Sequence, residues 1–147
     1  MKPAGHIVAS CAVSVFVWWY FRSSACALVS FLSGVLIDAD HLIDYFADHP
    51  FPAHPKKIYN ACRDIKCRKL YLFLHSYELI FLLWVLIWAL SLSDIWKAFA
   101  IGLTQHVMLD QTTNPIIKTG YFLTVRIMKR FDKKSLIKIR SAPDGSS

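Results

Sequence analysis

Leu36-Ile37-Asp38-Ala39-Asp40-His41 closes one strongly apolar run of the chain, and His106-Val107-Met108-Leu109-Asp110 closes another. If both runs are helices, Asp38 and His41 lie three residues apart. His106 and Asp110 lie four apart, and either spacing places the two side chains on one helical face. A carboxylate and an imidazole supply the oxygen and nitrogen donors that a hard or borderline divalent cation prefers. The two stretches predict a metal site, provided that the fold brings the ends of both runs together.

The composition indicates a small integral membrane protein. Hydrophobic residues make up 55% of the 147 residues, and only 18% are charged. The mean hydropathy of +0.39 is too high for an ordinary soluble domain of this size. The length is that of one domain, which we expect to span residues 1–140 and to be followed by a disordered tail over residues 141–147.

Four apolar runs predict an all-α fold, a four-helix transmembrane bundle. The runs are Ile7–Phe21, Ala25–Ile37, Tyr71–Leu92 and Ile95–Leu109. The third is long enough by itself to cross a hydrocarbon core of about 30 Å. The first two reach the required ~20 residues only if their helices begin near Pro3 and end near Leu42.

The first two runs have competing interpretations. Lys2 and the Ala25-Cys26-Ala27 sequence are also compatible with a cleaved secretory signal. Because a second apolar run follows at once, we favour an uncleaved helical hairpin that turns at Ser23-Ser24. A re-entrant or interfacial hairpin stays open as a third interpretation.

Two polar segments are strongly basic. The segment from Asp44 to Lys69 is read as a polar loop, with a short amphipathic helix around Ile58–Leu70 on the bilayer surface. The segment from Tyr121 to Arg140 mixes apolar and basic residues and predicts a basic amphipathic C-terminal helix. Both would attract membrane lipid, anionic phospholipid in particular. Nucleic-acid binding through the same charge would be unspecific and is the weaker interpretation.

The positive charge predicts the orientation in the membrane. With four spans, both termini and the central loop lie on one side. Of the 17 Lys and Arg residues, only Arg22 and Lys97 fall on the other. The positive-inside rule then places both termini and the loop in the cytoplasm, at the inner membrane. In this arrangement the ionisable groups of all four helices lie at the cytoplasmic end: His6, Asp38, Asp40, His41, His75, Glu78, His106 and Asp110.

Ionisable groups gathered at one end of membrane helices tend to mark function, but each has an ordinary alternative. Asp38 and Asp40 could simply end a helix and keep a loop in water. His106 and Asp110 could bond to each other and cap the fourth helix. Taken together, the groups favour a metal site.

These residues resemble the motifs of the membrane-bound metal-dependent hydrolases, a family distantly similar to zinc-dependent phospholipase C. The matching motifs are Gly5-His6, Asp38-Ala39-Asp40-His41, His75-Ser76 and His106 through Asp110. The match extends over about residues 5–115. Where the family commonly carries a His-Arg pair just upstream of a Thr-His-Ser motif, this chain has Leu70-Tyr71 and Leu74. That departure bears on catalysis more than on metal binding.

The resemblance implies a set of roles. The implied ligands of one or two divalent metal ions, Zn²⁺ first and Mn²⁺ second, are His6, Asp38, His75, His106 and Asp110. Asp40 or Glu78 would act as general base, and His41 would hold a ligand in place. The bound metal would lower the pKa of water toward ~7 and polarise a phosphoryl or carbonyl oxygen.

The expected function is hydrolysis of a phosphoester or lipid-like substrate at the cytoplasmic face. Whether the chain is an enzyme stays open at this point. The alternative is a non-catalytic four-helix membrane protein that binds a partner or anionic lipid through its basic loop and tail. A transporter is a weaker third interpretation, because the polar groups lie at one end and not at the midplane.

Overall fold

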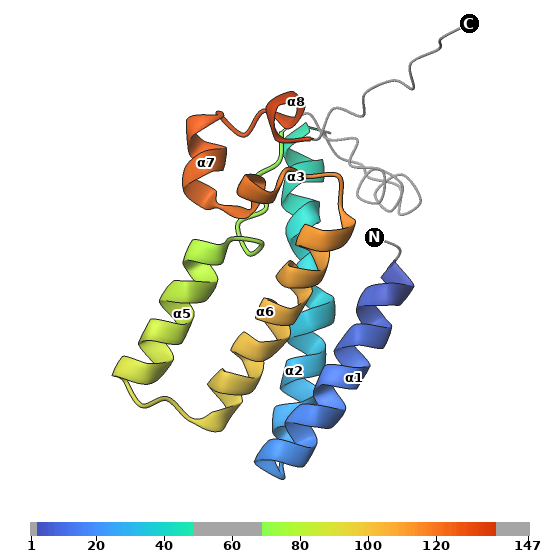
Figure 1. The fold of residues 1–147 in the computed structure, drawn as a ribbon, viewed down its shortest axis with the longest axis vertical. Coiled ribbons are helices and arrows are strands. Elements are labelled where there is room, and N and C mark those ends of the chain that lie inside the picture. The colour runs from blue at the N-terminus through green and yellow to red at the C-terminus, as the bar shows by residue number, and fades with distance from the viewer. Residues whose placement is uncertain (1–2, 49–68, 138–147) are drawn as a thin grey trace, which may run out of the picture.

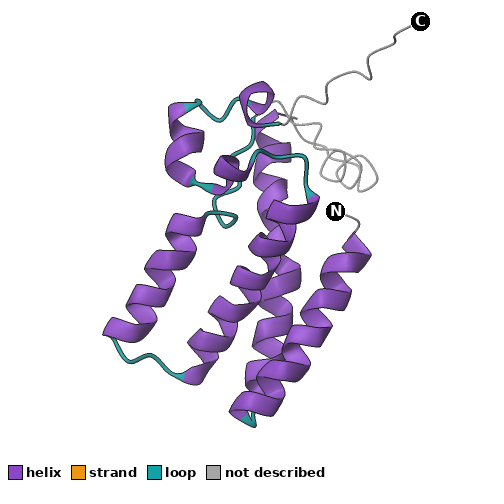
Figure 2. Cartoon of the chain, in the orientation of Figure 1, coloured by secondary structure: helices purple, strands orange, loops and turns teal. Residues whose placement is uncertain are grey.

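The computed structural model describes residues 3–48 and 69–137, and every regular element there is a helix (Figure 2). The helices are α1 Pro3–Phe21, α2 Ser24–Leu36, the 3-10 helix η1 Ile37–Ala39, α3 Asp40–Asp48, α5 Tyr77–Ala89, α6 Asp94–Thr113, the 3-10 helix η2 Lys118–Tyr121, α7 Leu123–Met128 and α8 Lys133–Leu136. The predicted all-α class is confirmed.

The helices α1, α2 and α6 pack side by side, and α5 lies against α6 (Figure 1). The short helices α7 and α8 gather at one end of this bundle, near α3. Two isolated β-bridges, Lys69 to Asp132 and Ile116 to Ile137, connect segments at that end. This end also carries the ionisable groups singled out above.

The first hairpin turns where the sequence predicted. Arg22 takes a positive φ of 51°, and the Ser23 side chain accepts a hydrogen bond from the Cys26 amide at 3.3 Å. A side-chain cap of this kind satisfies an amide that would otherwise have no partner at the start of a helix. The helix α1 begins at Pro3, as the span hypothesis required.

The predicted end of the second helix near Leu42 is wrong. After α2 the chain makes the single turn η1 and continues as α3 to Asp48. Asp44, expected to open a loop, is buried instead, and its Oδ1 accepts a hydrogen bond from the Tyr71 amide at 2.7 Å. The partner lies 27 residues away, so local sequence patterns carried no sign of it.

Small residues bring α2 and α6 into close contact. A Cβ at Gly102 would overlap Ser33 Oγ and the Ser30 carbonyl oxygen. Ser33 Oγ lies 3.1 Å from both the Ser30 and the Phe99 carbonyl oxygens, and the second contact joins the two helices. Close backbone approach through glycine and serine is typical of helix pairs in membranes. It brings the end of α2 next to the middle of α6.

The helix α1 has a polar inner face and an apolar outer face. Its buried positions include His6, Ser10 and Ser14, whereas Phe16 and Trp19 on the outside are more than half exposed. A helix on the surface of a soluble protein shows the opposite arrangement. Two helical stretches, Ala4–Phe21 and Ser24–Ala47, are long and apolar enough to cross a membrane by length and composition.

The prediction of a single helix over Tyr71–Leu92 is wrong. Only Tyr77–Ala89 is helical, and the preceding residues form a loop in which Leu72 has a φ of 42°. Thirteen residues reach about 20 Å, less than a hydrocarbon core. The loop is as apolar as a helix because Leu70 and Leu72 fill the core. Apolar content alone could not separate a buried loop from a span.

The predicted amphipathic helix over Tyr121–Arg140 is also wrong. The segment forms η2, α7 and α8, interrupted around Arg130 and Phe131, both of which have positive φ. Residues 138–140 lie outside the described residues. So do the predicted disordered tail and nearly all of the predicted surface helix at Ile58–Leu70. The described end of that predicted helix, Leu70, is buried and not helical.

Candidate metal centre

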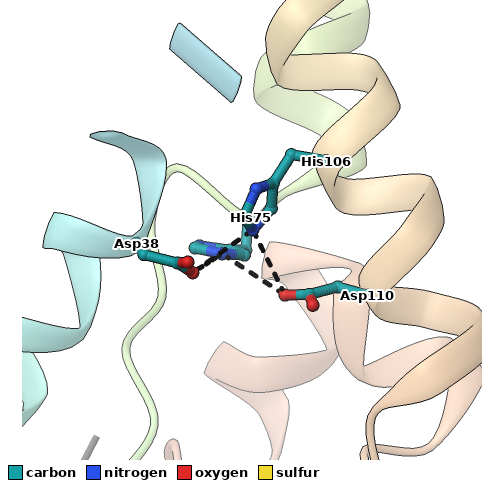
Figure 3. A group of neighbouring side chains, drawn as sticks. All are labelled: Asp38, His75, His106 and Asp110. Carbon is teal, nitrogen blue, oxygen red and sulfur yellow. Dashed lines mark ion pairs between the residues drawn. The ribbon is translucent and has the colours of Figure 1, made fainter. Parts of the chain in front are cut away.

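Four of the predicted ligands meet at one end of the bundle (Figure 3). Asp38 comes from η1, His75 from the loop before α5, and His106 and Asp110 from α6. One donor atom from each lies within 4.8 Å of the donor atoms of the other three, so that the group could hold a metal ion. Three of the residues are buried, and the Asp38 side chain is 41% exposed. The group is therefore open to its surroundings on the Asp38 side.

The two nitrogens of His106 have different partners. Nδ1 lies 2.6 Å from the Gly34 carbonyl oxygen, which can only accept a hydrogen bond. Nδ1 must therefore carry a hydrogen, and in the neutral ring Nε2 keeps its lone pair. Nε2 lies 3.2 Å from Asp38 Oδ1 and 3.6 Å from Asp110 Oδ2, and it is buried without a hydrogen-bond partner among the described residues.

His75 repeats this arrangement from the other side. Its Nδ1 lies 3.2 Å from Asp40 Oδ2, so Nδ1 donates to a carboxylate. Its Nε2 faces Asp38 Oδ1 at 3.8 Å and Asp110 Oδ2 at 3.5 Å, and it too is buried with no hydrogen-bond partner in the described part of the chain. Imidazole ligands of metals typically donate their second nitrogen to a carboxylate or a carbonyl, as both rings do here.

Four atoms of the group face one another: His75 Nε2, His106 Nε2, Asp38 Oδ1 and Asp110 Oδ2. All four are hydrogen-bond acceptors when the imidazoles are neutral and the carboxylates are ionised. Two imidazole lone pairs facing two carboxylate oxygens repel one another unless a positive charge lies between them. That charge can be a proton on an imidazole or a metal cation. Burial lowers the pKa of His75, but its interactions with the carboxylates of Asp38 and Asp40 outweigh this effect and raise the pKa overall. Two nitrogen and two oxygen donors match the preferences of Zn²⁺.

His6 lies beside this group. Its Nε2 is 3.0 Å from Oδ1 of Asp110, the carboxylate oxygen that does not face the other histidines. Its ring stacks on His106 with centroids 4.1 Å apart. His6 Nδ1 is buried and lacks a hydrogen-bond partner among the described residues. The four-atom group does not include His6, which steadies Asp110 and His106 from α1.

Two further predicted residues also border the group. Asp40 is buried, and its Oδ2 accepts a hydrogen bond from the Leu74 amide at 2.7 Å in addition to the contact with His75. Asp40 therefore orients His75 and the loop that carries it. His41 Nε2 lies 3.9 Å from Asp38 Oδ1, and its ring centroid is 5.3 Å from that of His75.

Glu78 does not join the group. Its carboxylate accepts hydrogen bonds from the Leu123 amide at 2.7 Å, the Thr124 amide at 3.0 Å and the Thr124 hydroxyl at 2.9 Å. These groups lie at the start of α7, where a carboxylate satisfies free amides and interacts favourably with the helix dipole. The geometry gives Glu78 a structural role in joining α5 to α7 and offers no support for it as a general base.

Arg126 is a residue that the sequence interpretation placed wrongly. It was expected on a basic surface helix, but it is 1% exposed. Its Nη1 donates to the carbonyls of Tyr71, at 2.6 Å, and Leu72. Its Nη2 donates to the His75 carbonyl, at 3.1 Å, and to Ser76 Oγ. Burial lowers the pKa of Arg126, while Asp40 and Glu78 oppose this effect.

Nothing near Arg126 in the sequence distinguishes it from the other cations of the segment. All of its partners are at least 50 residues away. The role of Gly34 was equally hidden, because it acts through a backbone carbonyl. In both cases the contact follows from the tertiary structure and leaves no local pattern.

Comparison of the chain with models of protein families, with curated proteins and with solved structures gives no match. The resemblance to membrane-bound metal-dependent hydrolases therefore rests on the short motifs, and the candidate metal centre rests on the geometry of its side chains.

Proposed function

We propose that this protein is a membrane-embedded, metal-dependent hydrolase that acts on a phosphoester or lipid-like substrate at the cytoplasmic face. The observation that carries the proposal is the convergence of His75 Nε2 and His106 Nε2 on Asp38 and Asp110. Both nitrogens are buried, lack a hydrogen-bond partner among the described residues, and belong to rings whose other nitrogen faces an acceptor. An unpaired buried polar atom is costly, and two aimed at the same carboxylates call for a cation.

Binding of Zn²⁺, or of Mn²⁺ as the second candidate, would supply Lewis acidity for a phosphoryl oxygen and a nucleophile from water near neutral pH. The chain's own residues prepare that chemistry. Asp40 and the Gly34 carbonyl fix the tautomers of the two histidines. The exposed side of Asp38 leaves the group accessible to a substrate. Asp40, the other residue that the resemblance implies as a general base, lies beside His75 Nδ1, the nitrogen that does not face Asp38 and Asp110.

The membrane part of the proposal rests on the outer surface of the bundle. Trp88 on α5 is 85% exposed and Phe81 is 71% exposed, and the outer face of α1 is similarly apolar. Such a surface in water would be an unusually large apolar patch. Together with the charge distribution of the sequence, it supports an inner-membrane protein with a cytoplasmic site.

Metal analysis of the purified protein tests the proposal. We expect stoichiometric Zn or Mn in the wild type and at least tenfold less in His106→Ala and Asp110→Ala. Lys118→Ala, an exposed change on η2, is the matched control and should leave the metal content unchanged. Absence of metal from well-folded wild type would overturn the metal centre. Metal without hydrolysis of any phosphoester would overturn the enzyme and leave a metal-binding protein.

One observation favours a second candidate, a non-catalytic membrane protein that recruits a partner or anionic lipid. The same side chains join three helices directly: His6 contacts Asp110, and His106 contacts Gly34. In that account the cluster exists to hold the helix ends together. Alanine at His106 would then lower the stability, while a chelator would change neither the stability nor any activity.

A further inference from the structure

An apolar groove of about 240 Å³ lies next to the candidate metal centre, lined from α2, η1, α6 and the loop before α5. Its lining includes Ile37 and Leu103, which are almost fully buried. It also includes Leu32, Leu36 and Leu74, which are 40%, 59% and 47% exposed. The groove therefore has a closed apolar interior and a margin of leucines that nothing in the described chain covers.

The groove offers a ligand almost no hydrogen bonds. Its one lining residue with a polar side chain is Ser33. The Ser33 hydroxyl lies within hydrogen-bonding distance of the Ser30 and Phe99 carbonyl oxygens, so its single hydrogen is already used within the helix pair. A sugar or a charged head group in this space would lose its contacts with water without replacement. A hydrocarbon chain would lose none.

Two residues that line the groove are the chain neighbours of two residues of the candidate metal centre. Ile37 immediately precedes Asp38, and Leu74 immediately precedes His75. A ligand whose apolar part fills the groove therefore has its polar end near two of the four donor residues. The exposed side chain of Asp38 leaves that end of the group open to it.

We infer that the groove holds the alkyl chain of an amphiphilic phosphoester whose head group reaches Asp38 and His75. The inference rests on the proposed function and specifies its substrate class, a phosphoester with at least one long alkyl or acyl chain.

Photo-crosslinking tests this assignment in the full-length protein, reconstituted in lipid nanodiscs with Zn²⁺ added. The probe is a long-chain alkylphosphonate with a diazirine at the end of the chain, and the labelled residues are identified by mass spectrometry. We expect labelling to concentrate on residues 29–37 and 99–103. Leu32→Trp should narrow the groove and lower that labelling at least tenfold.

The matched control is Leu86→Trp, which introduces the same side chain at 42% exposure on α5, outside the groove. It should leave the labelling of residues 29–37 and 99–103 unchanged. Val29→Trp, at a second lining position, keeps the test valid if Leu32→Trp does not fold. Labelling spread evenly over the outer faces of α1 and α5, unaffected by either groove variant, would overturn the assignment.

Failure of the groove and failure of the metal centre give different results. If the protein binds metal but the labelling is scattered, the alkyl-chain site is refuted and the metal centre is retained. If the groove is labelled, the labelling is lost in Leu32→Trp, and the protein binds no metal, the alkyl-chain site is retained and the metal-dependent hydrolase is refuted.

Discussion

The candidate metal centre has a helix-borne part and a loop-borne part, and the two are held in different ways. Asp38, His106 and Asp110 lie where α2 leads into η1 and on α6, which meet through a close contact at Gly102. His75 lies on an irregular loop whose carbonyls accept hydrogen bonds from the buried Arg126. The close contact of α2 and α6 positions the helix-borne part, and the guanidinium of Arg126 positions the loop-borne part.

This difference shows two ways in which a small chain can position side chains from segments that are distant in the sequence. Helix packing tolerates little displacement, because a tightly packed helix contact cannot be changed without forcing the helices apart. A loop has no such constraint, and several directed hydrogen bonds replace it. Breaking the helix contact should therefore unfold the protein, whereas breaking the loop contacts should first weaken the metal site.

The largest expected effect comes from Gly102→Leu. The new side chain would overlap Ser33 Oγ and the Ser30 carbonyl and separate α2 from α6. We expect a loss of about 3 kcal/mol in the free energy of unfolding, together with loss of bound metal. Unfolding in a denaturing detergent, followed by circular dichroism, measures the change.

Ala12→Leu is the control, because it places the same side chain at an exposed position of α1. It should change the free energy of unfolding by less than about 0.5 kcal/mol. Equal stabilities of Gly102→Leu and Ala12→Leu would show that the α2–α6 contact is not as close as described.

A smaller effect is expected from Arg126→Gln. The change leaves the carbonyls of Tyr71, Leu72 and His75 without their charged donor, at a cost of about 2 kcal/mol in stability. In the folded fraction, zinc affinity measured by competition with a chelator should fall at least tenfold, because His75 is no longer fixed.

Two variants sharpen this prediction. Arg130→Gln removes an exposed charge from the same segment and should leave zinc affinity unchanged. Arg126→Lys should restore only part of it, since one ammonium group cannot reproduce the geometry of the guanidinium. Wild-type zinc affinity in folded Arg126→Gln would show that Arg126 does not position His75.

The smallest effect is expected from Glu78→Gln. It weakens the hydrogen bonds to the start of α7 and should lower the free energy of unfolding by about 1 kcal/mol. Zinc content and any phosphoester hydrolysis should stay at wild-type levels, measured by metal analysis and product release. A hydrolysis rate that falls a hundredfold with stability intact would restore Glu78 as the general base.

The sequence predicted the helix-borne part of the centre better than the loop-borne part. The spacing of His106 and Asp110 requires only that α6 be a helix, and that expectation is confirmed. His75 was predicted as a site residue, but inside a helix that the structure replaces with a loop. Arg126 holds this loop through contacts across at least 50 residues, which no local periodicity records.

The same reasoning explains the errors in the fold. Apolar runs predicted the helices of the first hairpin because helix length and hydropathy are local properties. They failed for residues 71–76, where a buried apolar loop has the composition of a membrane span. They also failed for the C-terminal segment, where the predicted surface cation Arg126 is buried. Close packing at Gly102 likewise follows from the neighbouring helix and not from its own sequence context.

Zinc K-edge X-ray absorption of the zinc-loaded protein tests the central claim most directly. The account predicts nitrogen and oxygen ligands at about 2.0–2.1 Å, with the scattering signature of two imidazoles, and loss of one imidazole in His75→Ala. Zinc held by sulfur ligands, or by oxygen alone without imidazole, would contradict a centre made by Asp38, His75, His106 and Asp110.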